Sequence, residues 1–261
     1  MKIYNNIEEV INSGQISENS LINADCLDAM KYIKDKSIDL ILCDLPYGTT
    51  ACIWDSVIPF EPLWAEYERI IKDNGAILLF SSQPFTSQLI ASNLKLYRYE
   101  LIWEKSNSSN FIMAKRQPLK YHENIIVFYK KQPTYNPIMT KGKPNHGMGK
   151  KIGKKHNNNI FGAEVMTVSN KKDGWKYPKS ILKFKSVSRS MLKHPTEKPV
   201  ALLEYLIKTY TNENEVVLDN CAGSMSTGIA CINTNRRVIL IEKNKECFNI
   251  GRERMLNKED K

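Results

Sequence analysis

The chain has 261 residues and lacks the patterns that define several large classes of protein. No stretch approaches about 18 consecutive apolar residues, so the sequence contains no candidate transmembrane helix. The amino terminus carries Glu8 and Glu9 and has no apolar signal region. These absences predict a cytoplasmic protein.

Metal-ligand and disulfide patterns are missing as well. The six cysteines are scattered without a C-x-x-C pair, and the four histidines do not cluster. Neither a metal site nor a disulfide framework is therefore expected. Most of the cysteines are predicted to be small buried residues in a reducing compartment.

Acidic residues are scarce in one part of the chain. Between Lys130 and Arg189 there are 15 Lys or Arg but only two acids, whereas the formal charge of the whole chain is +10. One-sided charge on this scale favours a polyanionic partner, and nucleic acid is the usual one. A solvated basic surface is the alternative. Gly, Asn, Pro and Lys dominate the same segment, which has no regular helix or strand pattern.

Outside this segment the chain alternates strand and helix patterns, which predict a mostly parallel sheet with helices on both faces. Two further strands have no helical pattern between them and are expected to form an antiparallel hairpin; they are residues 97–104 and 124–130. The other expected strands are residues 20–24, 38–43, 76–80, 215–218 and 237–241. The expected helices are residues 27–33, 62–72, 85–93 and 199–210, and one that begins at 227.

The tetrapeptide Asp44-Leu45-Pro46-Tyr47 ends an apolar run that is typical of a buried strand. Open α/β sheets bind ligands at the carboxyl ends of their strands. Asp44 and the carbonyl beside Pro46 can accept the two hydrogens of an exocyclic amine, and the Tyr47 ring offers a stacking surface to a flat base. An ordinary exit from a strand, with the aspartate as a turn former, is the alternative interpretation.

A second motif lies far along the chain, where a strand ends at Asp219 and the small-residue turn 220–224 follows. The next strand ends at Glu242, 23 residues after Asp219. This is the pattern of a βαβ nucleotide-binding unit, in which the second acid can hold ribose hydroxyls. No G-x-G-x-x-G is present, and an acid in the turn would repel a pyrophosphate. A ligand with an ammonium and a sulfonium group, such as S-adenosylmethionine, suits Asp219 better; a generic strand-turn-helix is the alternative.

With these motifs in this order, the chain resembles the β group of DNA amino-methyltransferases, which act on adenine-N6 or cytosine-N4. In that group a catalytic D-P-P-Y precedes the cofactor loop, and a target-recognition segment lies between them. The matching stretches here are Asp44-Leu45-Pro46-Tyr47, the basic segment, His194-Pro195-Thr196-Glu197-Lys198-Pro199 and Leu218-Asp219-Asn220-Cys221-Ala222-Gly223-Ser224. The resemblance covers residues 20–130 and 190–256.

The resemblance implies an α/β fold of the S-adenosylmethionine-dependent, Rossmann-like methyltransferase type, with a circularly permuted motif order. It also implies a catalytic domain of residues 1–130 and 190–261. Residues 131–189 would then be an inserted, basic target-recognition segment that grips DNA.

Roles for individual residues follow from the same resemblance. Asp44, Pro46 and Tyr47 would form the catalytic set, with Asp44 orienting the amine and Tyr47 stacking on an extruded base. Glu242 would hold the cofactor's ribose and Asp25 its adenine. The remaining implied cofactor residues are Cys26, Asp44, His194, Thr196, Lys198, Asp219, Cys221, Ala222, Gly223 and Ser224, of which Thr196 and Lys198 would lie near the cofactor's carboxylate.

The chain departs from the family pattern in the cofactor turn. Met225 stands where the usual A-G-S-G-T-T has its second glycine, and Asn220 and Cys221 replace the usual Pro and Phe. If position 225 has a positive φ, methionine there costs about 1 kcal/mol or more. Its side chain would then also crowd the cofactor and weaken its binding, unless the turn is reshaped to fit the methionine. Leu45 replaces the first proline of the tetrapeptide, with little expected effect.

The resulting hypothesis is a site-specific DNA methyltransferase that transfers a methyl group from S-adenosylmethionine to N6 of an adenine flipped out of duplex DNA. Adenine is favoured because the tetrapeptide starts with Asp rather than Ser. The resemblance also implies a role in restriction-modification and a homodimer. The alternatives are a cytosine-N4 DNA methyltransferase, an RNA adenine methyltransferase, a catalytically disabled DNA-binding relative and, disfavoured by the absent glycine fingerprint, an NAD-type oxidoreductase.

Overall fold

The computed structural model describes residues 1–48, 55–142, 156–158, 163–165, 174–187 and 197–259. The chain divides into two compact units, one of Met1–Asn136 with Ser180–Lys261 and a smaller one of Pro137–Lys179. The expected insertion, residues 131–189, extends beyond the smaller unit at both ends. Its assignment to target recognition stays a prediction.

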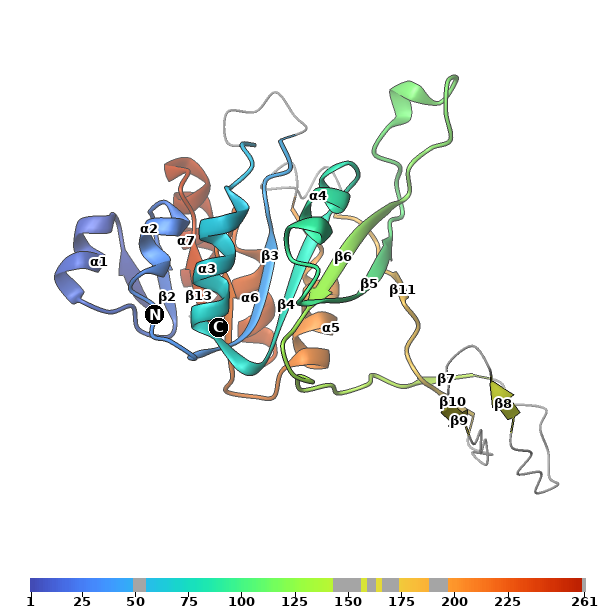
Figure 1. Ribbon diagram of the computed structural model, residues 1–261. Helices are drawn as coiled ribbons and strands as arrows, with labels where there is room; N and C mark the ends of the chain where they lie inside the picture. The colour runs from blue at the N-terminus through green and yellow to red at the C-terminus, as the bar shows by residue number, and fades with distance from the viewer. Residues whose placement is uncertain (49–54, 143–155, 159–162, 166–173, 188–196, 260–261) are drawn as a thin grey trace. The chain divides into compact units, whose positions relative to one another are not determined.

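The larger unit is built on a nine-stranded sheet with the order β1-β2-β13-β12-β3-β4-β6-β5-β11 (Figure 1). All pairs from β1 to β4 are parallel, whereas β6 runs antiparallel to both β4 and β5. The carboxyl ends of the parallel strands therefore meet the amino end of β6 at one edge. The strands are β1 (Lys2–Tyr4), β2 (Ser20–Ile22), β3 (Ile38–Asp44), β4 (Ile71–Ser81), β5 (Tyr97–Glu104), β6 (His122–Phe128), β11 (Ile181–Lys183), β12 (Val216–Asp219) and β13 (Arg237–Ile241).

The strand order reverses between β12 and β3, the two neighbours in the middle of the sheet. From β12 the chain passes to β13 on one side, and from β3 it passes to β4 on the other. A reversal of this kind opens a crevice at the carboxyl ends of the two strands, where open α/β sheets bind ligands.

Helices cover both faces of the sheet (Figure 1). One layer holds α1 (Ile7–Ser13), α2 (Cys26–Met30), α3 (Phe60–Ile70) and α4 (Phe85–Ser92); the other holds α5 (Val200–Tyr210), α6 (Ser226–Asn233) and α7 (Lys245–Glu259). Side chains of β3 alternate between the two layers, with Ile41 and Cys43 in one apolar cluster and Leu40 and Leu42 in the other. A strand buried on both faces reads as a continuous apolar run, which is why this strand was visible in the sequence.

The mostly parallel sheet, the two helical layers and the antiparallel β5–β6 hairpin agree with the sequence-based expectation. The helix expected at residues 62–72 differs, because it spans Phe60–Ile70 and β4 begins directly at Ile71. Asp73, Asn74 and Gly75, which follow the expected helix in the sequence, lie inside β4, where pairing jumps from Ile71 to Ala76. Those residues form an irregularity in a strand rather than the end of a helix.

Short strands occur where no regular structure was expected. β11 pairs in parallel with β5 at the end of the sheet, and of its three residues only Leu182 is buried. A strand this short has no alternation that a sequence pattern can reveal. In the smaller unit, β7 (Thr140–Lys141) pairs with β10 (Trp175–Lys176), and β8 (His156–Asn158) pairs with β9 (Ala163–Val165). Within the described ranges, every helix is too short or too polar to cross a membrane.

Candidate active site

A cavity of about 1280 Å³ lies at the carboxyl edge of the sheet in the larger unit. Its wall includes the tetrapeptide residues Asp44, Pro46 and Tyr47, and it also includes nine other residues for which the family resemblance implies a cofactor role. Those residues are Asp25, Cys26, Lys198, Asp219, Cys221, Ala222, Gly223, Ser224 and Glu242. Two stretches about 175 positions apart in the sequence thus share one cavity. His194 and Thr196 lie outside the described residues.

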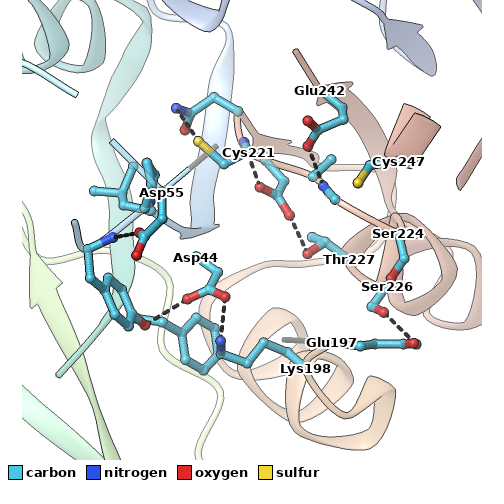
Figure 2. A pocket seen from close by; sticks show the side chains of 18 of the residues that line it. Asp44, Asp55, Glu197, Lys198, Cys221, Ser224, Ser226, Thr227, Glu242 and Cys247 are labelled. Atoms are coloured by element: carbon cyan, nitrogen blue, oxygen red, sulfur yellow. Dashed lines mark hydrogen bonds and ion pairs between the residues drawn. The ribbon is translucent and has the colours of Figure 1, made fainter. Parts of the chain in front are cut away.

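Asp44, at the end of β3, is held from two sides (Figure 2). Its Oδ1 accepts a hydrogen bond of 2.7 Å from the hydroxyl of Tyr47, and its Oδ2 pairs with the ammonium of Lys198. Burial and the Asp44 carboxylate raise the pKa of Tyr47 well above its ordinary value, so the phenol stays a donor. The Tyr47 ring stacks on Phe85 of α4, with ring centroids 5.2 Å apart.

The loop after β3 is fixed by Asp55, which the sequence motifs did not include. One carboxylate oxygen, Oδ1, accepts the backbone N–H groups of Tyr47 at 2.7 Å and of Gly48 at 2.9 Å. Asp55 also lines the cavity and is 8% exposed. It lies eleven positions after Asp44 in irregular chain, and no local pattern marks it.

A buried network of alternating charges extends from Asp44. The Lys198 ammonium lies 3.5 Å from Oε2 of Glu123, and Oε1 of the same glutamate accepts a 2.8 Å hydrogen bond from Lys105. Burial alone would lower the pKa of Lys198, but the carboxylates of Asp44 and Glu123 outweigh it and raise that pKa. Burial would raise the pKa of Glu123, but the two ammonium groups outweigh it and lower that pKa. Lys198 and Glu123 are therefore both held in their ionised forms in this half of the cavity.

The other half of the cavity is lined by carboxylates of β12 and β13. Asp219 accepts hydrogen bonds from the Thr227 hydroxyl at 2.6 Å and from the backbone N–H of Cys221 at 3.1 Å. Burial nevertheless raises the pKa of Asp219 to about 6. Glu242 accepts the backbone N–H groups of Gly223 at 2.7 Å and of Asn244 at 2.6 Å, and burial raises its pKa as well.

Asp25 lies at the end of the same half. One of its oxygens caps α2 by accepting the Leu27 N–H at 2.9 Å, and the other lies 3.1 Å from the ammonium of Lys243. Asp25, Asp219 and Glu242 thus give the strand ends a row of acids. A row of acids, two of which are destabilised as carboxylates by burial, is suited to a ligand that carries positive charge and hydroxyl groups.

Comparison with known proteins identifies the family. The family model of N6/N4 methylases, described as DNA methylase, matches residues 38–253. The chain belongs to the N6/N4 DNA methylase family.

Named relatives of this methylase cover most of its length. The type II methyltransferase M.HpaI of Haemophilus parainfluenzae is 28% identical over 250 residues, which is 90% of this chain and 73% of the relative. The DNA adenine methyltransferase YhdJ of Escherichia coli K12 is 28% identical over 257 residues, which is 90% of this chain and 82% of the relative.

Solved structures establish the fold of the methylase. The complex of M1.HpyAVI with SAM superposes with a TM-score of 0.59 at 24% identity, covering 90% of this chain and 98% of that one. The cytosine-N4-specific PvuII DNA methyltransferase gives a TM-score of 0.61 at 12% identity, covering 99% and 94%. The methyltransferase fold predicted from the sequence is confirmed.

Met225 has the strained backbone expected of the methylase's missing glycine. Its φ is 60° and its ψ is 35°, in the left-handed region. Its side chain does not line the cavity, however, which favours a turn that fits the methionine over one that crowds the cofactor. The side chain is fully buried against α7, where Gly251 leaves room for it: a Cβ on Gly251 would lie 2.6 Å from Cγ of Met225. A glycine one helix away thus compensates for the one absent from the turn.

The structure also accounts for the two other departures from the family's turn sequence, Asn220 and Cys221. Asn220 is buried, and its Oδ1 accepts a 2.6 Å hydrogen bond from the hydroxyl of Tyr67 on α3. Cys221 lines the cavity and is partly exposed. The polar Asn220 in place of a proline is therefore satisfied by a partner that no sequence motif pointed to.

Glu197, to which the sequence analysis gave no role, connects the segment before α5 to the cofactor turn and to α7. Its Oε1 accepts from the Ser226 hydroxyl at 3.0 Å and lies 2.7 Å from a guanidinium nitrogen of Arg254, which also donates to the Ser224 carbonyl at 3.1 Å. The start of α5 is thereby tied to the cofactor turn and to α7. Lys198, the next residue, is held at Asp44 rather than at the turn.

Proposed function

We propose that this methylase transfers a methyl group from S-adenosylmethionine to the exocyclic N6 of an adenine in duplex DNA. The observation that carries the proposal is the cavity itself. It joins an amine-binding set, Asp44, Pro46 and Tyr47, to the acids Asp219 and Glu242 within one space. A methyl donor and a base can react in one displacement only if both occupy such a space.

The acidic half of the cavity has the chemistry that the cofactor requires. Glu242 uses one lone pair of each oxygen on a backbone N–H, which leaves acceptor capacity for the two ribose hydroxyls. Asp219, with a pKa near 6, would be held in its ionised form by the ammonium of the cofactor's methionine part. Asp25 would accept from the adenine amine, and the turn at Cys221 to Ser224 would lie along the methionine chain. When bound, the cofactor supplies an electrophilic methyl group on a sulfonium.

In the target half, the partners of Asp44 leave room for an amine. Each of its two oxygens accepts from one donor, Tyr47 or Lys198, and keeps a second lone pair that can accept an amine hydrogen. Glu123 lies 3.5 Å from the Lys198 ammonium and provides it with a second carboxylate. Lys198 would therefore stay paired with a carboxylate even if it shifted away from Asp44 as the base enters.

Asp44 and the carbonyl next to Pro46 then accept the two amine hydrogens. This orients the nitrogen lone pair at the methyl carbon, at a separation of about 3–3.5 Å. Phe85 occupies one face of the Tyr47 ring, so the base would stack on the opposite face. The base must leave the duplex to reach this place, because its amine is otherwise paired and out of reach. The amine proton leaves after the transfer, and no covalent enzyme intermediate is required.

Adenine is favoured over cytosine by the first residue of the tetrapeptide and by the relative named as a DNA adenine methyltransferase. Cytosine-N4 is the second candidate, supported by the fold match to the PvuII enzyme. The relatives named as type II methyltransferases support a role in restriction-modification. Residues 131–189 would grip the phosphates, and a homodimer remains a prediction.

Asp44→Ala tests the catalytic assignment. We expect the variant to bind S-adenosylmethionine by calorimetric titration and to lose DNA methylation, because only the amine loses its acceptor. Sequencing of DNA from cells that make the protein, with detection of modified bases, identifies both the base and the target site. Turnover by the alanine variant, or N4-methylcytosine in place of N6-methyladenine, would contradict the proposal in its present form.

A further inference from the structure

The loop that joins β5 to β6, residues 105–121, carries two unusually exposed apolar side chains. Phe111 is 75% exposed and Ile112 is 96% exposed. Among the described residues, Ile112 is the most exposed of the large apolar side chains. Such exposure costs free energy in water, so the two side chains are expected to be covered in a complex.

The loop, here called the arm, extends past the ends of β5 and β6 and is held by internal hydrogen bonds (Figure 1). The Ser109 N–H donates to the Lys120 carbonyl at 3.1 Å, and the Asn110 side chain accepts the Lys120 N–H at 2.6 Å. The short turn η1 (Phe111–Met113) is closed by a 2.9 Å bond from the Met113 N–H to the Asn110 carbonyl. The apolar tip is therefore presented on a hydrogen-bonded scaffold.

The base of the same arm forms part of the cavity wall. Asn107, Ser108 and Ser109 line the cavity, as does Lys105, which contacts Glu123 inside it. Only one residue separates Ser109 from Phe111 in the chain. The exposed tip thus continues directly from the wall of the half that would receive the base.

The charge of the arm indicates what covers it. Residues 105–121 contain four Lys or Arg and no Asp or Glu. Lys115 and Arg116, just after the tip, are both exposed. Cations beside an apolar tip fit a duplex, in which phosphates pair with the cations and an apolar side chain enters between base steps.

We propose that Phe111 and Ile112 form a wedge that enters the DNA stack where the target base has left it. The inference rests on the proposed function, since a wedge is needed only if a base is extruded. By filling the vacated space, the two side chains would offset the lost stacking and hold the base in the cavity. Lys115 and Arg116 would hold the neighbouring phosphates and orient the arm.

The test uses the full chain and the target site found by modified-base sequencing. The double variant Phe111→Ser with Ile112→Ser is compared with wild type and with Leu94→Ser, a control whose side chain is 67% exposed outside the arm. Two duplexes are methylated, one with the target base paired and one with it opposite an abasic site, where extrusion is easy. S-adenosylmethionine affinity, thermal unfolding and sedimentation mass are measured for each protein.

We expect the double variant to lose about 10- to 100-fold in kcat/KM on the paired duplex and to recover most of it on the abasic duplex. The control variant should methylate both duplexes at the wild-type rate, and all three proteins should bind S-adenosylmethionine with the same affinity. Equal activity on the paired duplex, or an equal loss on both duplexes, would overturn the wedge while leaving the methylation itself intact. A change in sedimentation mass would also overturn it, because the tip would then be a contact between copies. If wild type methylates neither duplex, the proposed function fails first.

Discussion

The burial of Asp219 in the cavity lowers the stability of the folded protein by an amount that can be measured. The carboxylate is buried at the end of β12, and burial raises its pKa from an ordinary 3.8 to about 6 in spite of the hydrogen bonds from Thr227 and Cys221. Between these two pKa values the folded protein keeps a proton that the unfolded chain has released. The free energy of unfolding therefore falls as the pH rises through this window.

The size of the effect follows from the shift. A shift of two pKa units corresponds to about 3 kcal/mol in the free energy of unfolding. The protein keeps this stability below pH 4 and has lost it above pH 6. Asparagine has nearly the same shape and no charge to desolvate. We therefore expect Asp219→Asn to gain stability relative to wild type as the pH rises from 4 to 7, by as much as about 3 kcal/mol.

The assay is urea unfolding of both proteins, without ligand, at several values between pH 4 and pH 8. Asp28→Asn, which removes an exposed carboxylate on α2, controls for the change in net charge. The same Asp219 variant should bind S-adenosylmethionine at least about tenfold more weakly at pH 7.5, because the partner of the cofactor's ammonium is gone. A stability difference that stays constant from pH 4 to pH 8 would refute the reasoning.

Three other predictions follow from contacts described above. Gly251→Ala places a Cβ 2.6 Å from Cγ of Met225 and should cost about 1–3 kcal/mol in urea unfolding, part of which Met225→Gly in the same chain should restore; no rescue would mean that the two positions are not coupled. Tyr67→Phe removes the donor to the buried Asn220 amide oxygen and should cost about 1–3 kcal/mol, and a loss near zero would contradict the importance of that bond. If the basic segment neutralises about six phosphates, the logarithm of DNA affinity should fall with the logarithm of salt concentration with a slope near −5; a flat response would exclude phosphate contacts.

The sequence allowed the sheet and both motif-bearing strand ends to be predicted because these strands are buried on both faces. Ile41 and Leu42, for example, belong to opposite apolar clusters, and such strands appear as uninterrupted apolar runs. Asp44 and Asp219 stood out because each follows such a run directly. Their proximity followed from parallel topology, since the carboxyl ends of parallel strands share an edge.

The parts that were missed depend on contacts between distant positions. Asp55 and Glu123 reach the cavity from an irregular loop and from the start of an antiparallel strand, neither of which carries a motif. The accommodation of Met225 depends on Gly251, 26 positions later on another helix. A single sequence does not connect the two positions, because Met225 stands out in its turn but Gly251 is an ordinary residue of its helix.

The two halves of the cavity differ in charge in a way that matches the two proposed ligands. On the cofactor side, the hydrogen-bond donors to Asp219 and Glu242 within the described ranges are a hydroxyl and backbone N–H groups, and both carboxylates are destabilised by burial. On the target side, Glu123 is balanced by Lys105 and Lys198, so the charge there is nearly neutral. A cationic cofactor stabilises the first half, whereas a neutral base attached to a polyanion would be repelled by unpaired acids in the second. Under the proposed function, the lysines beside Glu123 would allow an acidic residue, Asp44, to face DNA without opposing its approach.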